Sequence, residues 1–515
     1  MRQANRSEAV EQVVVTAQQM REIEERIFQA GMPVAALMEK VAGLIARRIQ
    51  ALYPLSLCQK IGVLVGPGHN GGDALVVARE LHLQGYDVLV YRPLSKLKEL
   101  TSQHAQYGAS LGIPFSEKIV SLHQCDLIID GLFGFGLTRS LSGEIAEAVE
   151  QLNQWSQPVV SIDLPSGMDT DTGEVLGTAV HASRTFCLGL WKLAFLQDQA
   201  LAYLGETELI DFGIPAMDIW AILGQPAGMM RMSAAAAHSF LPLPKAQVTY
   251  KYQEGHLLLI CGSRQYAGGA ILTGMGARGS GVGMLSIAVP ESLKPILVSH
   301  LPEALIIGCP ETETGAIAQL PAEVNLSKFS GIACGPGLTL GAKSVIEAAL
   351  QAQCPLVLDA DGLNILADLG TLPTLTKRQQ PTVLTPHLGE FKRLFPDLGD
   401  SSDRVSMVRQ ASQVSQAVVL LKGARTAIAH PRGSVWLIPE STPALARGGS
   451  GDVLTGLVGG LVAQPALSKQ PLEATVAVAA WWHAQAGIMA AQERTELGVD
   501  AFTLSQYLFN QYLFK

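Results

Sequence analysis

The stretch Arg447-Gly-Gly-Ser-Gly-Asp-Val-Leu-Thr-Gly456 carries three glycines and a serine directly before an aspartate and a long apolar run. The apolar run, residues 453–462, predicts a buried helix with the glycines in a loop at its N-terminus. Closely spaced N–H groups and the positive end of the helix dipole suit that loop to an anion such as a phosphate. Asp452 would lie in the first helical turn, where a base for a phosphate-accepting hydroxyl is needed. A glycine-rich turn with an acidic helix start explains the same residues about equally well, so the rest of the chain must decide.

Length and composition predict a protein of two or three α/β domains. The chain has 515 residues, of which 48% are hydrophobic and only 16% are charged, so large buried cores can form. A formal net charge of −8 and the lack of a Lys/Arg-rich run argue against a nucleic-acid partner. The seven cysteines are dispersed and never spaced C-x-x-C, which indicates a reducing compartment and no zinc site.

Two segments bear on membrane association. The N-terminus, MRQANRSEAVEQ, is polar and mixed in charge, unlike a signal peptide. Residues 474–492 are uncharged over about the length of a membrane span, but they include His483, Gln485 and Gln492. We therefore expect a buried core helix there, and a soluble, cytoplasmic protein without a membrane partner.

The first half begins with a βαβ pattern. Helical spacing over residues 15–48, broken at Gly31-Met-Pro33, precedes a predicted strand at 60–65. A glycine turn, a helix over 73–84 and a strand at 87–91 follow. The turn also spells G-x-G-x-x-G, typical of dinucleotide-binding dehydrogenases. That match is weak, because Tyr91-Arg92 stand where an acidic residue is expected, although an arginine could accept a 2′-phosphate.

Polar side chains follow three predicted strands of this half. Asn70 and Asp73 follow the first strand, Asp130 ends the strand at 125–130, and Asp163 and Ser166 follow the strand at 158–163. Carboxyl ends of parallel strands meet at one edge of a sheet, so we expect Asn70, Asp130, Asp163 and Ser166 to converge there. Oxygen ligands of this kind suit a hard cation or ribose hydroxyls.

The motifs GPGHNGGD, IIDGLFGFGLTR and SIDLPSG, with Thr185-Phe-Cys-Leu-Gly-Leu-Trp-Lys192, resemble the NAD(P)H-hydrate epimerase domain over residues 15–215. The resemblance implies a Rossmann-like fold, a potassium ion held by Asn70, Asp130 and Ser166, and Asp163 with Lys192 as acid/base groups at the hydroxyl-bearing C6. It implies that the hydrated cofactor is bound by His69, Asn70, Gly71, Gly72, Asp73, Gly134, Phe135, Gly136, Leu137, Thr138, Arg139, Ser140 and Asp163. The chain departs from the family at His69 and Ala74, where Asn and Gly are usual.

The second half starts a new α/β series after a junction near residues 225–235. Strands are predicted at 255–263, 331–337, 355–361, 381–390 and 417–426. A small-residue helix opens at Tyr266, and its glycines indicate close packing against another helix. Lys422, Arg425 and Thr426 end the last strand and suit nucleotide phosphates.

The motifs GPGL, LDADGLN, TPHLGE, LKGART and GGSGDVLTG resemble the ADP/ATP-dependent NAD(P)H-hydrate dehydratases of the ribokinase-like superfamily, over residues 235–510. The resemblance implies that Ala270, Gly337, Pro386, His387, Leu388, Gly389, Glu390 and Asp452 contact the hydrated cofactor. It implies that ADP or ATP is held by Lys422, Gly423, Ala424, Arg425, Thr426, Arg447, Gly448, Gly449, Ser450 and Gly451. Asp452 would take the C6 hydroxyl proton. Mg²⁺ is expected for phosphoryl transfer, with Glu390 and Asp361 as candidate ligands.

Together the two resemblances predict a bifunctional enzyme that repairs hydrated NADH and NADPH. We expect an epimerase domain over residues 1–228 with a Rossmann-like three-layer sandwich, and a dehydratase domain over 229–515 with a ribokinase-like one. A homo-oligomer is expected. Two alternatives stay open: a kinase that phosphorylates a hydroxymethyl group on a small heterocycle, and a first half that only binds its ligand. A stable phosphorylated product would favour the kinase, and loss of potassium dependence would favour the binding module.

Overall fold

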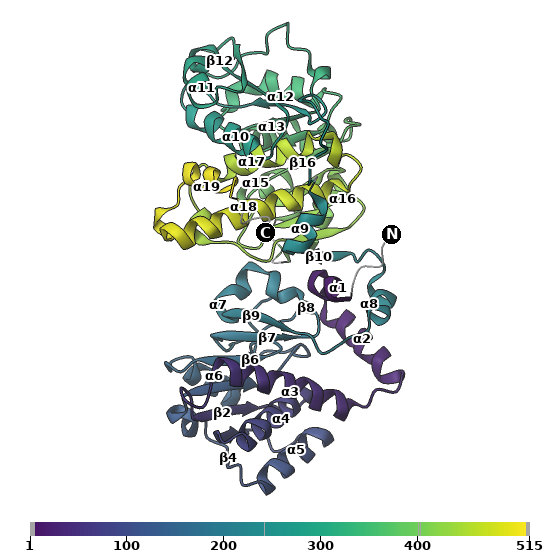
Figure 1. Ribbon diagram of the computed structural model, residues 1–515, viewed down its shortest axis with the longest axis vertical. Helices are drawn as coiled ribbons and strands as arrows, with labels where there is room; N and C mark the ends of the chain where they lie inside the picture. Colours follow the sequence, from purple (N-terminus) through teal and green to yellow (C-terminus); the bar gives the residue numbers. More distant parts are fainter. Residues whose placement is uncertain (1–5, 242, 400, 402, 511–515) are drawn as a thin grey trace. The chain divides into compact units, whose positions relative to one another are not determined.

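The computed structural model describes residues 6–241, 243–399, 401 and 403–510. The chain divides into two compact units, Met1–Ala227 and Gly228–Lys515. Each unit is an α/β structure built on one large sheet (Figure 1), which confirms the predicted fold class.

The first unit contains a seven-stranded parallel sheet in the order β4-β3-β2-β5-β6-β7-β9. Its strands are β2 (Lys60–Val65), β3 (Asp87–Tyr91), β4 (Phe115–Ser116), β5 (Leu127–Gly131), β6 (Val159–Ile162), β7 (Arg184–Leu188) and β9 (Glu206–Ile210). From β2 the chain moves outward to β3 through α4 (His69–Leu83), whereas from β5 it moves the other way to β6 through α6 (Gly143–Leu152). Right-handed crossovers therefore place these two helices on opposite faces of the sheet. The loops after β2 and β5 part at this point, where ligands bind in open α/β sheets.

The N-terminal segment pairs with a strand from the end of this unit's sequence. Strand β1 (Val14–Val15) pairs in parallel with β8 (Trp191–Lys192), with Val15 beside Lys192. Helix α2 (Ala17–Gln29) follows at once and is capped by Thr16, whose side chain accepts the Gln19 N–H. The predicted break precedes α3 (Val34–Leu52). The prediction that Val15 belongs to a helix was wrong, and α4 begins at His69 rather than at residue 73.

The second unit contains a ten-stranded sheet in the order β10-β19-β18-β17-β16-β15-β14-β11-β12-β13. Its strands are β10 (Met229–Arg231), β11 (His256–Ile260), β12 (Met284–Pro290), β13 (Leu305–Cys309), β14 (Gly331–Cys334), β15 (Leu356–Leu358), β16 (Thr382–Leu384), β17 (Val418–Leu421), β18 (Ala427–Ala429) and β19 (Val435–Leu437). Only β18 runs antiparallel to its two neighbours. The direction in which the chain adds strands reverses between β11 and β14. The carboxyl ends of β14 to β17 therefore form a second edge at which a ligand is expected to bind.

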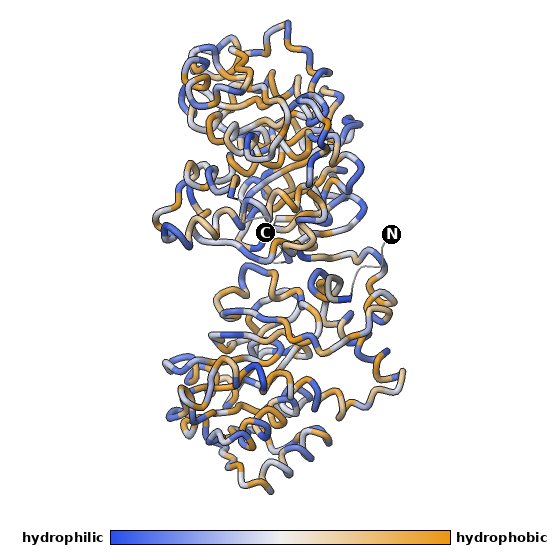
Figure 2. The backbone as a smooth tube through the Cα atoms, viewed as in Figure 1, coloured by the Kyte–Doolittle hydropathy of each residue, from blue (hydrophilic) through white to orange (hydrophobic). Residues whose placement is uncertain are grey.

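Helices cover both faces of this sheet. Helices α10 (Ala267–Gly279), α17 (Ser450–Val462) and α18 (Leu472–Arg494) pack in sequence against one another. The other group is α12 (Lys343–Leu350), α13 (Asp361–Leu369), α15 (Leu388–Leu394) and α16 (Arg404–Ser415). In Figure 2 hydrophobic stretches run through the strands and the helices beside them, where the core residues are buried. The uncharged segment at 474–492 belongs to α18, most of which is buried in this core, as predicted. Among the described residues, no helix is long and apolar enough to span a membrane.

The backbones of α10 and α17 touch through glycines, which confirms the predicted packing role of the small-residue helix. A Cβ added at Gly456 would lie 1.9 Å from the carbonyl oxygen of Thr273, and one added at Gly276 would lie 2.0 Å from that of Val453. The glycines are therefore needed for this approach, which fixes the start of α17 beside α10.

All seven cysteines are free and buried. Burial raises the pKa of the Cys58 and Cys125 thiols to about 11 and of the Cys309 and Cys334 thiols to about 12. The thiols therefore contribute apolar volume to the cores rather than charge.

We expect Gly456→Ala to lower the stability of the second unit by about 1–3 kcal/mol, because the added methyl forces two packed helices apart. Scanning calorimetry of the full chain measures the change. Gly268→Ala in α10 is the matched control, since its methyl would meet nothing within 4 Å and alanine favours a helix. Equal melting temperatures of the second unit in the two variants would contradict this explanation of the packing.

Candidate functional site

The first unit has a cavity of about 490 Å³ where the loops after β2 and β5 separate. Its lining includes the predicted residues His69, Asn70, Asp73, Gly134, Phe135, Gly136, Leu137, Thr138, Arg139, Asp163 and Lys192. Helical residues that the sequence analysis did not select as site residues also line it, among them Arg21, Glu24 and Phe28 from α2. Of the four strand-end residues expected to converge, Asn70 and Asp163 line this cavity.

A buried ion pair lies in the wall of this cavity. The Lys192 ammonium is fully buried, 2.6 Å from Asp163 Oδ1, and also donates to the Leu188 carbonyl oxygen at 2.5 Å. The second Asp163 oxygen accepts the Phe135 N–H at 2.8 Å. Burial lowers the pKa of Lys192, but the Asp163 carboxylate outweighs burial and the pKa ends raised. Lys192 is therefore a charged group at neutral pH, although it lies out of contact with water.

Two further carboxyl groups share the cavity with this pair. Burial, followed by the charges of Asp163 and Glu24, raises the pKa of Asp73 well above its usual value. Burial also raises the pKa of Glu24 to about 7, with Lys192 and Asp163 acting on it in opposite senses. Three carboxyl groups and one lysine therefore surround a space in which a proton can be held near neutral pH.

The predicted potassium ligands lie deeper in the sheet edge. Asp130 is fully buried and accepts four hydrogen bonds: from the Ser161 hydroxyl, from the N–H and hydroxyl of Ser166, and from the Leu132 N–H. The Asn70 amide has a buried Nδ2 without a hydrogen-bond partner among the described residues. Rotation of that amide by about 180° would turn its oxygen toward the same place. An oxygen-rich environment with one carboxylate and an unsatisfied amide fits a monovalent cation.

Several predicted residues of this half lie outside the cavity lining. A Cβ at Gly71 would lie 2.0 Å from the Gly66 carbonyl oxygen, and one at Gly72 would lie 2.7 Å from the Met38 methyl, so both glycines permit packing. Ser140 is exposed. Ala74 is fully buried and its methyl faces Gly131 of β5, so the departure at this position affects packing. His69 does line the cavity, and burial together with Lys98 lowers its pKa.

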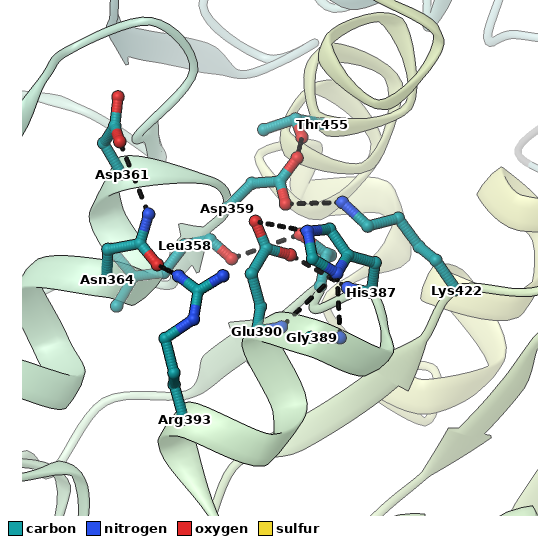
Figure 3. Close-up of polar contacts among 11 residues, drawn as sticks. Leu358, Asp359, Asp361, Asn364, His387, Gly389, Glu390, Arg393, Lys422 and Thr455 are labelled. Carbon is teal, nitrogen blue, oxygen red and sulfur yellow. Dashed lines mark hydrogen bonds and ion pairs between the residues drawn. The ribbon is translucent and has the colours of Figure 1, made fainter. Parts of the chain in front are cut away.

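The second unit has a corresponding lysine, partly buried, at its own sheet edge (Figure 3). Asp359, directly after β15, accepts the Lys422 ammonium at 2.7 Å and the Thr455 hydroxyl at 2.5 Å. Asp359 and Thr455 are almost fully buried. Burial lowers the pKa of Lys422, but the charge and hydrogen bond of Asp359, with the charges of Glu390 and Asp452, together outweigh burial, so the pKa is raised. This contact joins β15, β17 and α17 beneath the glycine loop.

Asp452 lies in the first turn of α17, as predicted. Burial and the charge of Asp359 raise its pKa to about 7, against the lowering effect of Lys422. Its carboxylate faces α10 and the turn after β14: a Cβ at Gly269 would lie 3.5 Å from Asp452 Oδ2 and 3.6 Å from the Gly337 N atom. Asp452 and Gly337 therefore meet, whereas Ala270 is fully buried with its methyl near Gly262.

The start of α17 has the geometry expected of an anion site. Gly449 adopts the left-handed conformation (φ 91°) at the N-cap. Arg447 and Gly448 are exposed, and so are Gly423 and Ala424 across the edge. Below them, His483 of α18 contacts the Ser450 carbonyl oxygen at 3.0 Å, and burial lowers its pKa to about 4. The loop is thus supported by a neutral imidazole, and the Ser450 N–H donates to the Arg447 carbonyl oxygen at 3.3 Å.

The TPHLGE segment forms a capping box at the start of α15 (Figure 3). His387 Nδ1 accepts the Gly389 N–H at 3.0 Å, while Glu390 accepts the His387 N–H at 2.8 Å. Pro386 is buried, whereas His387, Leu388 and Gly389 are exposed.

The candidate Mg²⁺ ligands are engaged elsewhere. Asp361 accepts the Thr339 N–H at 2.8 Å, and Glu390 belongs to the capping box. Among the described residues there is no group of three His, Cys, Asp or Glu side chains placed to hold a metal ion. No catalytic step is assigned to Glu390 or Asp361.

The sites define an enzyme with two α/β catalytic units. The family model described as YjeF-related protein N-terminus matches residues 34–194, and the one described as NAD(P)H-hydrate dehydratase matches residues 257–510. The chain belongs to the family of bifunctional NAD(P)H-hydrate repair enzymes, as its similarity to curated members shows.

One such enzyme, from Synechocystis sp., is 59% identical over 96% of this chain and 94% of its own length. Another, from Thermosynechococcus vestitus, is 52% identical over 94% of each chain. A solved ADP/ATP-dependent NAD(P)H-hydrate dehydratase from Bacillus subtilis, co-crystallised with ATP and Mg²⁺, is 33% identical. That match covers 54% of this chain and 95% of the other, with a TM-score of 0.46.

We expect Asp163→Asn to destabilise the first unit by about 3–5 kcal/mol, because it leaves the Lys192 ammonium buried without its counter-charge. Calorimetric unfolding of the full chain measures the loss. The double variant Asp163→Asn/Lys192→Met is the control and should regain most of the stability, since no unpaired charge remains. A single variant as stable as the double one would contradict the role of the ion pair.

Proposed function

We propose that this protein restores hydrated NADH and NADPH in two steps, one in each unit. The first unit interconverts the R and S forms of the hydrate at C6. The second unit dehydrates the S form at the expense of ADP or ATP. The proposal is supported by family membership over nearly the whole chain and by one feature of the structure. That feature is Asp452, a carboxyl group with a pKa near 7 at the start of the helix after the glycine loop.

The second unit converts a poor leaving group into a good one. The C6 hydroxyl gives its proton to Asp452, and its oxygen attacks the terminal phosphorus of the nucleotide, breaking the bond to the bridging oxygen and releasing AMP from ADP or ADP from ATP. A base with a pKa near the working pH is effective for this transfer. The C6–O bond then breaks with its electron pair on the phosphate, and loss of a C5 proton forms the C5–C6 double bond of the repaired cofactor.

The glycine loop and Lys422 bind charge during this reaction. N–H groups of residues 448–451 face the transferred phosphoryl group at the N-terminus of α17, where the helix dipole stabilises negative charge. Lys422 to Thr426 and Arg447 bind the remaining phosphates. Gly337, Ala270 and the segment Pro386–Glu390 form the side of the site that holds the nicotinamide hydrate. Mg²⁺ bound to the nucleotide would neutralise its phosphates.

In the first unit, His69, Asn70, Asp73 and the segment 134–139 bind the hydrated cofactor, and Asp163 with Lys192 performs acid/base chemistry at C6. Asn70, Asp130 and Ser166 hold a potassium ion, whose positive charge offsets the buried carboxylate. The cytoplasmic location and the homo-oligomeric state expected from the sequence stay predictions.

The test is the recovery of absorbance at 340 nm from a mixture of R and S hydrates, with K⁺, Mg²⁺ and either ADP or ATP. Full recovery supports both activities, whereas recovery that stops when the S form is consumed removes the epimerase. A stable phosphorylated product without recovery would indicate a small-molecule kinase instead.

For Asp452→Asn we expect dehydration of the S form to slow by about 10²–10⁴-fold, because the amide cannot accept the proton. In the parent protein kcat/KM should rise with pH through about 7, as Asp452 loses its own proton, and this limb should be absent from the variant. Initial rates at 340 nm between pH 5.5 and about 9 measure both effects. Epimerisation by the same variant is the internal control and should be unchanged. A variant that keeps the rising limb would exclude Asp452 as the base.

Replacing K⁺ by choline should lower both the epimerisation rate and the melting temperature of the first unit, since a bound ion stabilises the folded state. Asn70→Ala should abolish the stabilising effect of K⁺ on melting, with the melting of the second unit as the reference. If K⁺ and choline gave the same melting temperature in the parent protein, the potassium site would be disproved.

A further inference from the structure

One wall of the cavity in the first unit is formed by a helix rather than by strand ends, and it carries an acidic side chain. Glu24 lies on α2 and lines the cavity together with Asp163 and Lys192. Helix α2 is held there by β1, in which Val15 pairs with Lys192 itself. The short β1–β8 pair therefore brings a helical carboxyl group to the site where the Asp163–Lys192 pair lies.

Glu24 differs from the other carboxyl groups of this site in what it contacts. Asp163 is held by Lys192 and by the Phe135 N–H, and Asp130 accepts four hydrogen bonds. No hydrogen bond or ion pair engages the Glu24 carboxylate among the residues that the structure describes. Its carboxyl group is thus free to contact a molecule in the cavity.

The charged surroundings of Glu24 come from four directions. Lys192 and Asp163 face it from the sheet edge, Arg21 from its own helix, and Asp73 from α4. Helix α8 (Ala216–Leu223), which packs against α2, contributes Asp218, whose charge is paired with Arg26 at 3.3 Å. Burial has the largest effect on the pKa of Glu24, which lies near 7.

Inversion at C6 needs proton transfer on two faces of the ring. C6 is bonded to the ring nitrogen N1, whose electron pair can expel the hydroxyl as water if an acid donates a proton. The C6–O bond breaks toward oxygen, and an N1–C6 double bond forms. Water must then add to the opposite face, and a base must take its extra proton. One carboxyl group cannot serve both faces of a bound ring.

We propose that Glu24 is the second proton-transferring residue of the epimerase and serves the face of C6 opposite Asp163. This assignment rests on the epimerase activity proposed above for the first unit. For one epimer Glu24 donates the proton and Asp163 accepts one from the incoming water. For the other epimer the roles are exchanged, so one water leaves and one is added in either direction. The proton returns to its first position by exchange with solvent.

The two-residue scheme determines the pH dependence. The productive pair carries a single proton, on Glu24 for one epimer and on Asp163 for the other, so both directions depend on pH in the same way. Activity therefore falls when pH rises past the value at which the pair loses this proton, which is about 7 from Glu24. Glutamine at position 24 cannot titrate, so this falling limb would disappear.

The experiment uses the full chain and purified R hydrate with K⁺ but no nucleotide, so that the second unit is idle. Chromatography follows formation of the S form above the uncatalysed rate. We expect Glu24→Gln to lower kcat by about 10²–10⁴-fold with little change in KM, and to remove the falling limb of kcat/KM near pH 7. Glu24→Asp should retain part of the rate. In H₂¹⁸O, each inversion by the parent protein should place one labelled oxygen on C6.

Two controls separate this assignment from other causes. Glu25→Gln changes the next residue of α2, which is exposed and accepts the Gln29 amide at 3.1 Å, and should behave as the parent. Dehydration of the S form by Glu24→Gln should be normal, and the first unit should melt at the parent temperature, which shows that both units of the variant are folded. Parent-like kcat in Glu24→Gln, a loss confined to KM, or inversion without label would overturn the assignment. Failure of the parent protein to epimerise would instead overturn the proposed function of the first unit.

Discussion

In both units a lysine, fully buried in the first and partly buried in the second, is held against a buried aspartate at the carboxyl edge of the sheet. The two Nζ–Oδ1 distances are 2.6 Å for Lys192 and Asp163 and 2.7 Å for Lys422 and Asp359. Neither charge could remain in these cores alone, because an unpaired buried ion costs several kcal/mol. Each pair in turn sets the environment of a third group, Glu24 in one unit and Asp452 in the other, whose pKa lies near 7. A fixed pair of opposite charges beside one carboxyl group that can change its charge is therefore the common plan of the two sites.

The two sheets reach this plan by different topologies. The first has seven parallel strands, whereas the second has ten with β18 reversed. In each, the backbone takes a left-handed conformation at a strand end beside the pair: Asp163 has a φ of 70° and Ala360, next to Asp359, has a φ of 47°. Such conformations cost about 1–3 kcal/mol and persist only where the surrounding contacts impose them.

Much of the fold and of the first site could be predicted from the sequence. Apolar runs predict buried parallel strands, and the C-terminal ends of such strands lie at one edge of the sheet. Asn70, Asp73, Asp163 and Lys192 were found in this way or by resemblance, and they line one cavity. Glu24 was missed, since the spacing of α2 reveals only its buried face and nothing local reveals that two residues of β1 pair with β8. Asp359 was missed because the prediction named Asp361, the second aspartate of the same motif, as a candidate ligand. The first polar residue after a strand was the better choice, since Asp359 directly follows β15.

The burial of all seven cysteines determines how reactive their thiols are in the folded protein. Thiolate is the form that reacts with oxidants and electrophiles, and burial suppresses its formation at neutral pH. The folded chain therefore presents few reactive sulfur atoms to its surroundings, while unfolding of either unit exposes several at once. Cys58, Cys125 and Cys187 belong to the first unit, and Cys261, Cys309, Cys334 and Cys354 to the second. The native chain thus carries built-in reporters from which the opening of each unit can be read as a rate of alkylation, without any added probe.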